Sequence, residues 1–389
     1  MVTFTAERNS FSPVKLTDMK RIVVIVLTIG ALVVGFLVIF QKGDDARIAT
    51  AQPEETSSEE LRQTIQVGRS DTFTPWPTEP VIETQATTNW LARMQAGDFP
   101  SLSSEEAEAY VAASKRSAES LLAAYRASTD RTFLREALEK FPDDPKVNFA
   151  GYCDAFRNGA SYTTEERRAL LDRLTKSAPE NSLGNFLAAY DYFNKGESDK
   201  ALEQIRNAAT KSSLNDYSLE FIQNAEEAYR NAGYSEADAK AIATSTLILP
   251  HLSQLKQAGV GLLDLAGRYQ QSGDDVQAQE ALQLALHLAD MLQDGSQHKA
   301  IINQLVGISI ESKVLNTLDP NHAYDNSGRT VQQRIDELAQ NRKNLNANVG
   351  PMENLLPIMT PADQSAYFDR MKLFGEEAAM TWAVGKYGN

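Results

Sequence analysis

The stretch that decides the fold is residues 189–208, AYDYFNKGESDKALEQIRNA, which recurs as residues 266–285, AGRYQQSGDDVQAQEALQLA. The two stretches share small residues, a tyrosine, a glycine and a branched apolar residue at the same spacing. The matched pairs are Ala189 with Ala266, Tyr192 with Tyr269, Gly196 with Gly273, Ala201 with Ala278, Ile205 with Leu282, and Ala208 with Ala285. A pattern that returns around a glycine is typical of repeated helical hairpins.

Two further glycines, Gly159 and Gly233, fall in register with Gly196 and Gly273, so that the four are spaced by 37, 37 and 40 residues. Glycine adopts a left-handed backbone conformation without the steric penalty of a side chain. We therefore expect each of these glycines to end the first helix of a hairpin.

The pattern resembles the tetratricopeptide repeat (TPR) family, whose units are 34-residue helical hairpins. The resemblance covers roughly residues 130–292. In such a unit the small residues Ala189 and Ala201 let the paired helices approach, and Tyr192 fills the space between them. The chain departs from the family pattern in its longer spacings and in Asp238, which stands where an alanine is expected. The predicted fold class is all-α, with a right-handed TPR-like α-solenoid.

Helix-start signals extend beyond the repeats. Ser103 with Glu106, and Thr163 with Glu166, have the spacing of a capping box, and Thr360 precedes a proline at a first helical position. The first signal predicts one long amphipathic helix to about residue 127. The region 103–295 is predicted to hold the repeats, and 296–389 a divergent helical part. Helices in that last region are expected over Ile301–Leu318, Thr330–Leu345 and Pro361–Lys386.

The N-terminal part contains one uncharged apolar run, Ile22–Phe40. Its 19 residues would span roughly 28 Å as a helix, close to the thickness of a bilayer core. Cations before the run predict a cytoplasmic tail over 1–21 and a C-terminal domain in the periplasm, with the protein in the inner membrane. A cleaved signal peptide is the alternative, because Ala49-Thr50-Ala51 follows. The sequence leaves open a start at Met1 or Met19.

Residues 41–102 read as a flexible linker. They include the acidic stretch PEETSSEE and the proline-spaced run Thr74–Pro80. Prolines at this density prevent a helix and favour an extended chain. The linker therefore predicts a tether in front of the helical region.

Composition excludes several classes of site. The net charge of −14 argues against a nucleic-acid partner, which needs a basic face. Cys153 is the only cysteine, so neither an intrachain disulfide nor a thiolate zinc site can form. The four histidines are scattered, match no metal-binding spacing and are expected on the surface. We find no nucleotide or catalytic motif, and we predict no cofactor, no metal and no catalytic residue.

Helical spacing places two sets of aromatic and sulfur-bearing residues in equivalent positions of neighbouring units. Each set runs i, i+4, i+7 and so forms one helical face. The sets are Phe149, Cys153 and Phe156, and Phe186, Tyr190 and Phe193. The resemblance implies that these faces line a concave groove for a peptide with apolar anchors. The alternative is that the stripe is ordinary core or packs against the helix expected at 104–127.

These features predict a membrane-anchored interaction scaffold of the bacterial cell envelope that binds a protein or peptide partner. An envelope enzyme that acts on cell-wall material, with the repeats as a docking module, is the alternative, and it requires clustered, perturbed carboxylates. A third possibility is self-association into a homo-oligomer. The sequence does not name the partner.

Overall fold

Every regular element is helical within residues 100–157, 159–295, 300–325 and 327–388, the ranges that the computed structural model describes. Two isolated β-bridges, Asn181 with Ser213 and Ala323 with Thr330, are the only extended pairings in these ranges. The all-α prediction is confirmed. The predicted tail at 1–21, the apolar run Ile22–Phe40 and the linker up to residue 99 lie outside the described residues.

The described helices contradict the predicted location in the inner membrane. Within the described ranges none is long and apolar enough to cross a membrane. Even the longest of them, α13 (Pro250–Ser272), carries charged residues such as Lys256, Asp264 and Arg268. The run Ile22–Phe40, on which that prediction rested, is outside these ranges.

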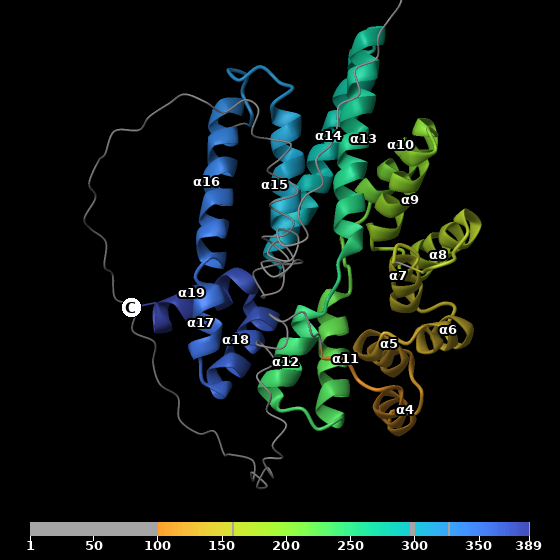
Figure 1. The fold of residues 1–389 in the computed structure, drawn as a ribbon. Coiled ribbons are helices and arrows are strands. Elements are labelled where there is room, and N and C mark those ends of the chain that lie inside the picture. The colour runs from red at the N-terminus through yellow and green to blue at the C-terminus, as the bar shows by residue number, and fades with distance from the viewer. Residues whose placement is uncertain (1–99, 158, 296–299, 326, 389) are drawn as a thin grey trace, which may run out of the picture.

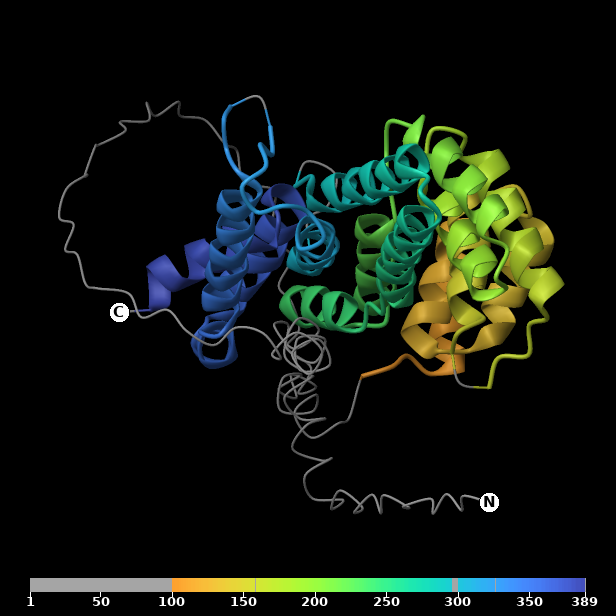
Figure 2. The ribbon, with the colours of Figure 1, turned by 90° about the horizontal axis from the view of Figure 1, so that it is seen from above.

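The helices α4–α10 form a curved row (Figures 1 and 2). Consecutive helices pack against each other from α4 to α10. Their bounds are α4 (Ser104–Ala113), α5 (Ala118–Ser128), α6 (Arg131–Lys140), α7 (Pro145–Asp154), α8 (Thr164–Ser177), α9 (Leu183–Asn194) and α10 (Ser198–Ala209).

The next hairpin, α11 (Ser218–Asn231) with α12 (Glu236–Ser245), leaves this row. Helix α11 returns to pack against α5 near the start of the row, and α12 packs against α18 (Pro361–Phe374). The following hairpin, α13 with α14 (Asp275–Gln293), then packs against α9 and α10. The row thus continues from α9–α10 directly to α13–α14, and α11–α12 forms a side branch that faces α5 (Figure 1).

The C-terminal helices extend this arrangement. Helix α15 (Ile301–Leu315) packs on α13 and α14, and α16 (Val331–Val349) packs on α15. Gly307 permits the close approach of α14 and α15, because a Cβ there would lie 2.6 Å from the carbonyl oxygen of Ala289. The remaining elements are α17 (Met352–Leu355), the 3₁₀-helix η1 (Leu356–Ile358) and α19 (Glu376–Tyr387).

The four glycines of the repeat register share one conformation. Gly159, Gly196, Gly233 and Gly273 have φ values of +76°, +74°, +91° and +80°. All four lie in the left-handed region, as predicted from their spacing. The small residues Ala189, Ala201, Ala266 and Ala278 are all buried, and Tyr192 and Tyr269 pack partly buried against the core.

The helix starts follow the local signals, whereas two predicted helix lengths are wrong. The capping boxes at Ser103 and Thr163 form. The long helix expected over 104–127 is instead α4 and α5, because Lys115 and Arg116 adopt left-handed φ values of 56° and 52°. Likewise Gly375, at φ +95°, divides the helix predicted over 361–386.

Candidate functional site

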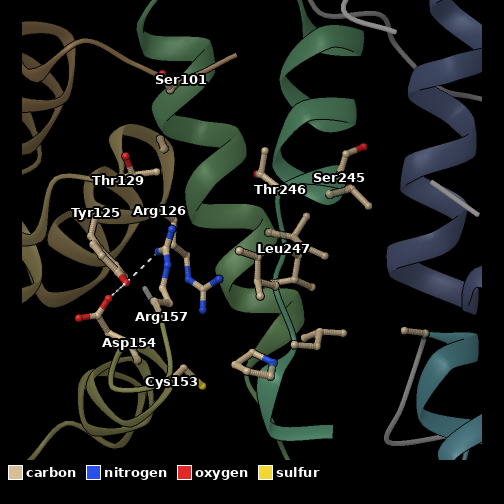
Figure 3. A pocket seen from close by; sticks show the side chains of 18 of the residues that line it. Ser101, Tyr125, Arg126, Thr129, Cys153, Asp154, Arg157, Ser245, Thr246 and Leu247 are labelled. Carbon is tan, nitrogen blue, oxygen red and sulfur yellow. Dashed lines mark hydrogen bonds between the residues drawn. The ribbon is translucent and has the colours of Figure 1, made fainter. Parts of the chain in front are cut away.

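A cavity of about 440 Å³ lies between the curved row and the α11–α12 branch. Helices α5, α7 and α11 supply one part of its wall, and the connection from α12 to α13 supplies the part opposite (Figure 3). Residues at or beside the starts of α15 and α19 complete the wall. The volume is within the range of roughly 300–1,000 Å³ that is typical of small-molecule sites.

Most of the wall is apolar. Alanines of α5 and α7 contribute small surfaces, and the α12–α13 connection contributes a run of aliphatic residues. The larger apolar side chains that line the cavity include Ile222, Leu247, Leu249, Ile302 and Met371. Such a surface favours a ligand with hydrocarbon or aromatic content.

Arg126 is a buried charged residue of this wall. It lies on α5, a helix that is buried along most of its length because α4, α6, α7 and α11 surround it. Its guanidinium stacks over the ring of Phe221, 3.9 Å from the centroid. The Nε atom is buried and has no hydrogen-bond partner, and no carboxylate of the described residues lies within ion-pair distance. Burial lowers the pKa of Arg126, and the nearby charge of Arg157 adds to this.

A second arginine, Arg157, stands beside Arg126 just after the end of α7 (Figure 3). Its Nη1 donates to the hydroxyl of Tyr125 at 2.9 Å. That hydroxyl donates in turn to Oδ1 of Asp154 at 2.6 Å, and Arg131 Nε donates to the same oxygen at 3.0 Å. Burial, with the hydrogen bond to Asp154, raises the pKa of Tyr125 well above its usual value. Asp154 is therefore paired with Arg131, and the hydroxyl of Tyr125 lies between Asp154 and Arg157.

Other polar groups border the cavity. The hydroxyl oxygens of Thr244 and Ser245, at the end of α12, are buried and have no hydrogen-bond partner. Glu376 starts α19, and its Oε2 accepts the Ile301 N–H at 2.8 Å. Burial raises the pKa of Glu376 to about 7. The cavity therefore combines two arginines, free hydroxyls and a carboxyl group that titrates near neutrality.

The structure separates the first set of predicted groove residues. Phe149 is buried in the core, where its ring stacks near Phe221 with centroids 6.2 Å apart. Phe156 is 39% exposed and packs edge-on against Tyr152. Only Cys153 lines the cavity, and its sulfur points toward it (Figure 3). Burial raises the pKa of this thiol to about 12, so it is protonated at neutral pH and is no nucleophile.

The second set packs within the repeat region. Phe186 is fully buried, whereas Tyr190 and Phe193 are partly buried against the core. Gly261 of α13 leaves room for the ring of Phe193, because a Cβ at Gly261 would lie 2.7 Å from it. Phe193 of α9 thus packs closely against α13. The two predicted sets do not share one open groove.

Among the histidines that the structure describes, His251 departs most clearly from the expected surface position, and His298 lies outside the described residues. His251, expected on the surface, is 1% exposed, and its Nε2 lies 3.1 Å from Oδ2 of Asp216. Within the described residues no group of three or more histidine, cysteine, aspartate or glutamate side chains is arranged to hold a metal ion. The site chemistry therefore rests on the arginines and the apolar wall.

Comparison of the chain with models of protein families, with curated proteins and with solved structures finds no match. The geometry of the cavity is thus the basis for any functional inference.

Sequence reasoning missed Arg126 and Arg157. The available signal was one arginine within the apolar run LLAAYRAS of residues 121–128, where a charge is unusual on a helix that is apolar on most sides. Arg157 follows Phe156 and carries no comparable signal. Their proximity depends on the packing of α5 against α7, which no local pattern encodes.

Proposed function

We propose that this chain is a helical-repeat interaction scaffold that holds a ligand, or a short segment of a partner, in the cavity beside Arg126 and Arg157. The repeat region is then a right-handed TPR-like solenoid from which one hairpin, α11–α12, is displaced. The left-handed glycines and the buried small residues of the hairpins support the TPR-like part of this proposal. The bound partner has a small apolar part that enters the cavity.

The observation that carries the proposal is the pairing of an enclosed apolar wall with polar groups that lack partners. Unsatisfied buried polar atoms are rare in folded proteins, since each costs free energy. Here Arg126 Nε and the hydroxyls of Thr244 and Ser245 line one cavity without partners. A ligand that supplies acceptors to these atoms would remove the cost.

Binding is favoured over the enzymatic alternative by how the carboxylates of the cavity are held. An enzyme that cleaves cell-wall glycosidic bonds with a carboxyl pair needs the two groups to converge on one substrate bond. Asp154 faces Tyr125 and Arg131, and Glu376 faces the Ile301 amide. Both groups are thus engaged by the protein itself.

A cavity-filling substitution tests the proposal. Cys153→Trp places a large side chain where the sulfur now faces the cavity, and Val276→Trp, at a 75% exposed site on α14, is the matched control. Binding of the neutral solvatochromic dye Nile red to the full chain is measured by its emission shift, with the fold checked by circular dichroism. We expect Cys153→Trp to lose most of the binding and Val276→Trp to keep it. A folded Cys153→Trp variant that binds the dye like the wild type would refute the cavity as the binding site.

A further inference from the structure

We propose that the cavity binds an amphipathic anion, with a carboxylate or phosphate head between Arg126 and Arg157 and a hydrocarbon chain along the apolar wall. This inference rests on the proposed binding function and names the class of ligand. The head group and the chain are each argued from separate features of the cavity.

The two positive charges of Arg126 and Arg157 favour an anionic ligand. Arg126 and Arg157 stand side by side (Figure 3), and burial, together with the nearby charge of Arg157, lowers the pKa of Arg126. Arginine nevertheless remains protonated in proteins. In the part of the chain that the structure describes, neither residue has a carboxylate in ion-pair contact, and Oδ1 of Asp154 accepts from Tyr125 and Arg131. Two adjacent positive charges at a largely apolar wall are stabilised by a bound negative charge.

The donors of the two arginines suit an oxyanion. A guanidinium carries five N–H donors in a planar fork that matches the oxygens of carboxylate or phosphate. Arg157 uses one donor on Tyr125, and Arg126 presents an unpartnered Nε. Thr244 and Ser245 lie at the end of α12, on the part of the wall opposite the arginines, so the two guanidinium groups supply the donors to the head group.

The rest of the wall suits a chain of carbon atoms. The α12–α13 connection presents Leu247 and Leu249 to the cavity, and Ile222, Ile302 and Met371 extend the apolar surface. A sugar phosphate would leave its hydroxyls against this surface without partners, which is unfavourable. A nucleic acid is disfavoured by the small volume and by the net charge of −14. An acid with a hydrocarbon chain satisfies both parts of the cavity.

Four probes with the same ten-carbon chain separate the head-group classes. Decanoate and decyl phosphate carry the two anionic heads, 1-decanol is neutral, and decyltrimethylammonium is cationic. Each is titrated into the full chain below its micelle concentration by isothermal calorimetry. We expect one decanoate or decyl phosphate per chain, bound at least tenfold more tightly than decanol, and no binding of the cation. The tighter of the two anions identifies the head.

Substitutions locate the head group. Arg126→Met and Arg157→Met remove the charge but keep much of the side-chain length, and Arg135→Met removes the same charge from an exposed position on α6. We expect each of the first two to weaken the anion at least tenfold and leave decanol unchanged, because a hydrogen bond to a charged group is lost. Arg135→Met should bind like the wild type. Arg157, which is only partly buried, keeps the test valid if Arg126→Met does not fold.

The outcomes separate the ligand class from the binding function. Equal binding of decanol and decanoate, or anion binding unaffected in both arginine variants, overturns the anionic head. The anionic head is also overturned if none of the four probes binds while Nile red still binds and Cys153→Trp blocks it. That result leaves the proposed binding function in place. If a folded Cys153→Trp variant binds Nile red like the wild type, the binding function itself is refuted.

Discussion

Glu376→Gln is expected to stabilise the protein at alkaline pH and to leave its stability near pH 4.5 almost unchanged. Glu376 is 6% exposed at the start of α19, and its carboxyl accepts the Ile301 N–H at 2.8 Å. Burial raises its pKa from 4.5 to about 7, although the hydrogen bond from Ile301 acts in the opposite direction. The neutral amide of glutamine can accept the same hydrogen bond without carrying a charge into the interior.

The magnitude follows from the two pKa values. The carboxyl is protonated in both folded and unfolded chains below about pH 4.5, so its titration contributes no difference in stability there. As pH rises from 4.5 to about 7, the unfolded chain loses the proton first, and the free energy of unfolding falls. Above pH 7 the loss is complete at about 3 kcal/mol. Glutamine does not titrate, and it should recover this amount at pH 8.5.

Urea unfolding of the full chain, followed by circular dichroism at pH 4.5 and pH 8.5, measures the effect. Glu377→Gln is the matched control, because Glu377 is the exposed next residue of the same helix. We expect the control to follow the wild type at both pH values. Equal destabilisation by Glu376→Gln at both pH values would refute the reasoning, since the neutral carboxyl at pH 4.5 and the charged one at pH 8.5 would then contribute the same stability.

Two further pairs of substitutions are expected to act through backbone conformation and buried charge, each measured as the free energy of urea unfolding at pH 7. Gly196→Ala should destabilise the protein by about 1 kcal/mol, because the backbone φ at this position is +74°. Gly267→Ala, in a helix with open space around the residue, should stabilise the protein by up to about 1 kcal/mol. Effects of the same sign in the two variants would contradict the backbone argument. Arg334→Met should cost about 3–5 kcal/mol, because it strands the fully buried carboxylate of Glu311, to which Arg334 Nε donates at 2.7 Å. The more exposed Arg329→Met should cost under about 1 kcal/mol, and similar losses in both variants would contradict the argument.

The cavity depends on an interruption of the repeat order. The hairpin α11–α12 has the most degraded repeat pattern, and it is the hairpin that leaves the row to contact α5 and α18. The sequence showed that this unit departs from its neighbours at positions such as Asp238. It did not show where the unit packs, because its buried faces have partners more than 80 residues away in the chain.

The sequence by itself determined the helical class, the helix starts and the four left-handed glycines. These features depend on interactions within a few residues, such as the capping bonds of Ser103 and Thr163 or the steric freedom of Gly196. A pattern of local spacing is therefore enough to predict them. It failed even locally where Lys115 and Arg116 break the first helix, since neither residue is a usual helix terminator.

Only the tertiary structure decided which side chains face a ligand. Spacing placed Phe149 and Phe186 at equivalent positions on the faces of two neighbouring helices, but a face can point to solvent or to the core. Both rings are buried, and that of Phe149 stacks near Phe221 of α11. Arg126 and Arg157 come together because α5 packs against α7, and the cavity exists because α11 closes over them. Burial and charge pairing are properties of contacts between distant segments, and periodicity in one segment cannot specify them.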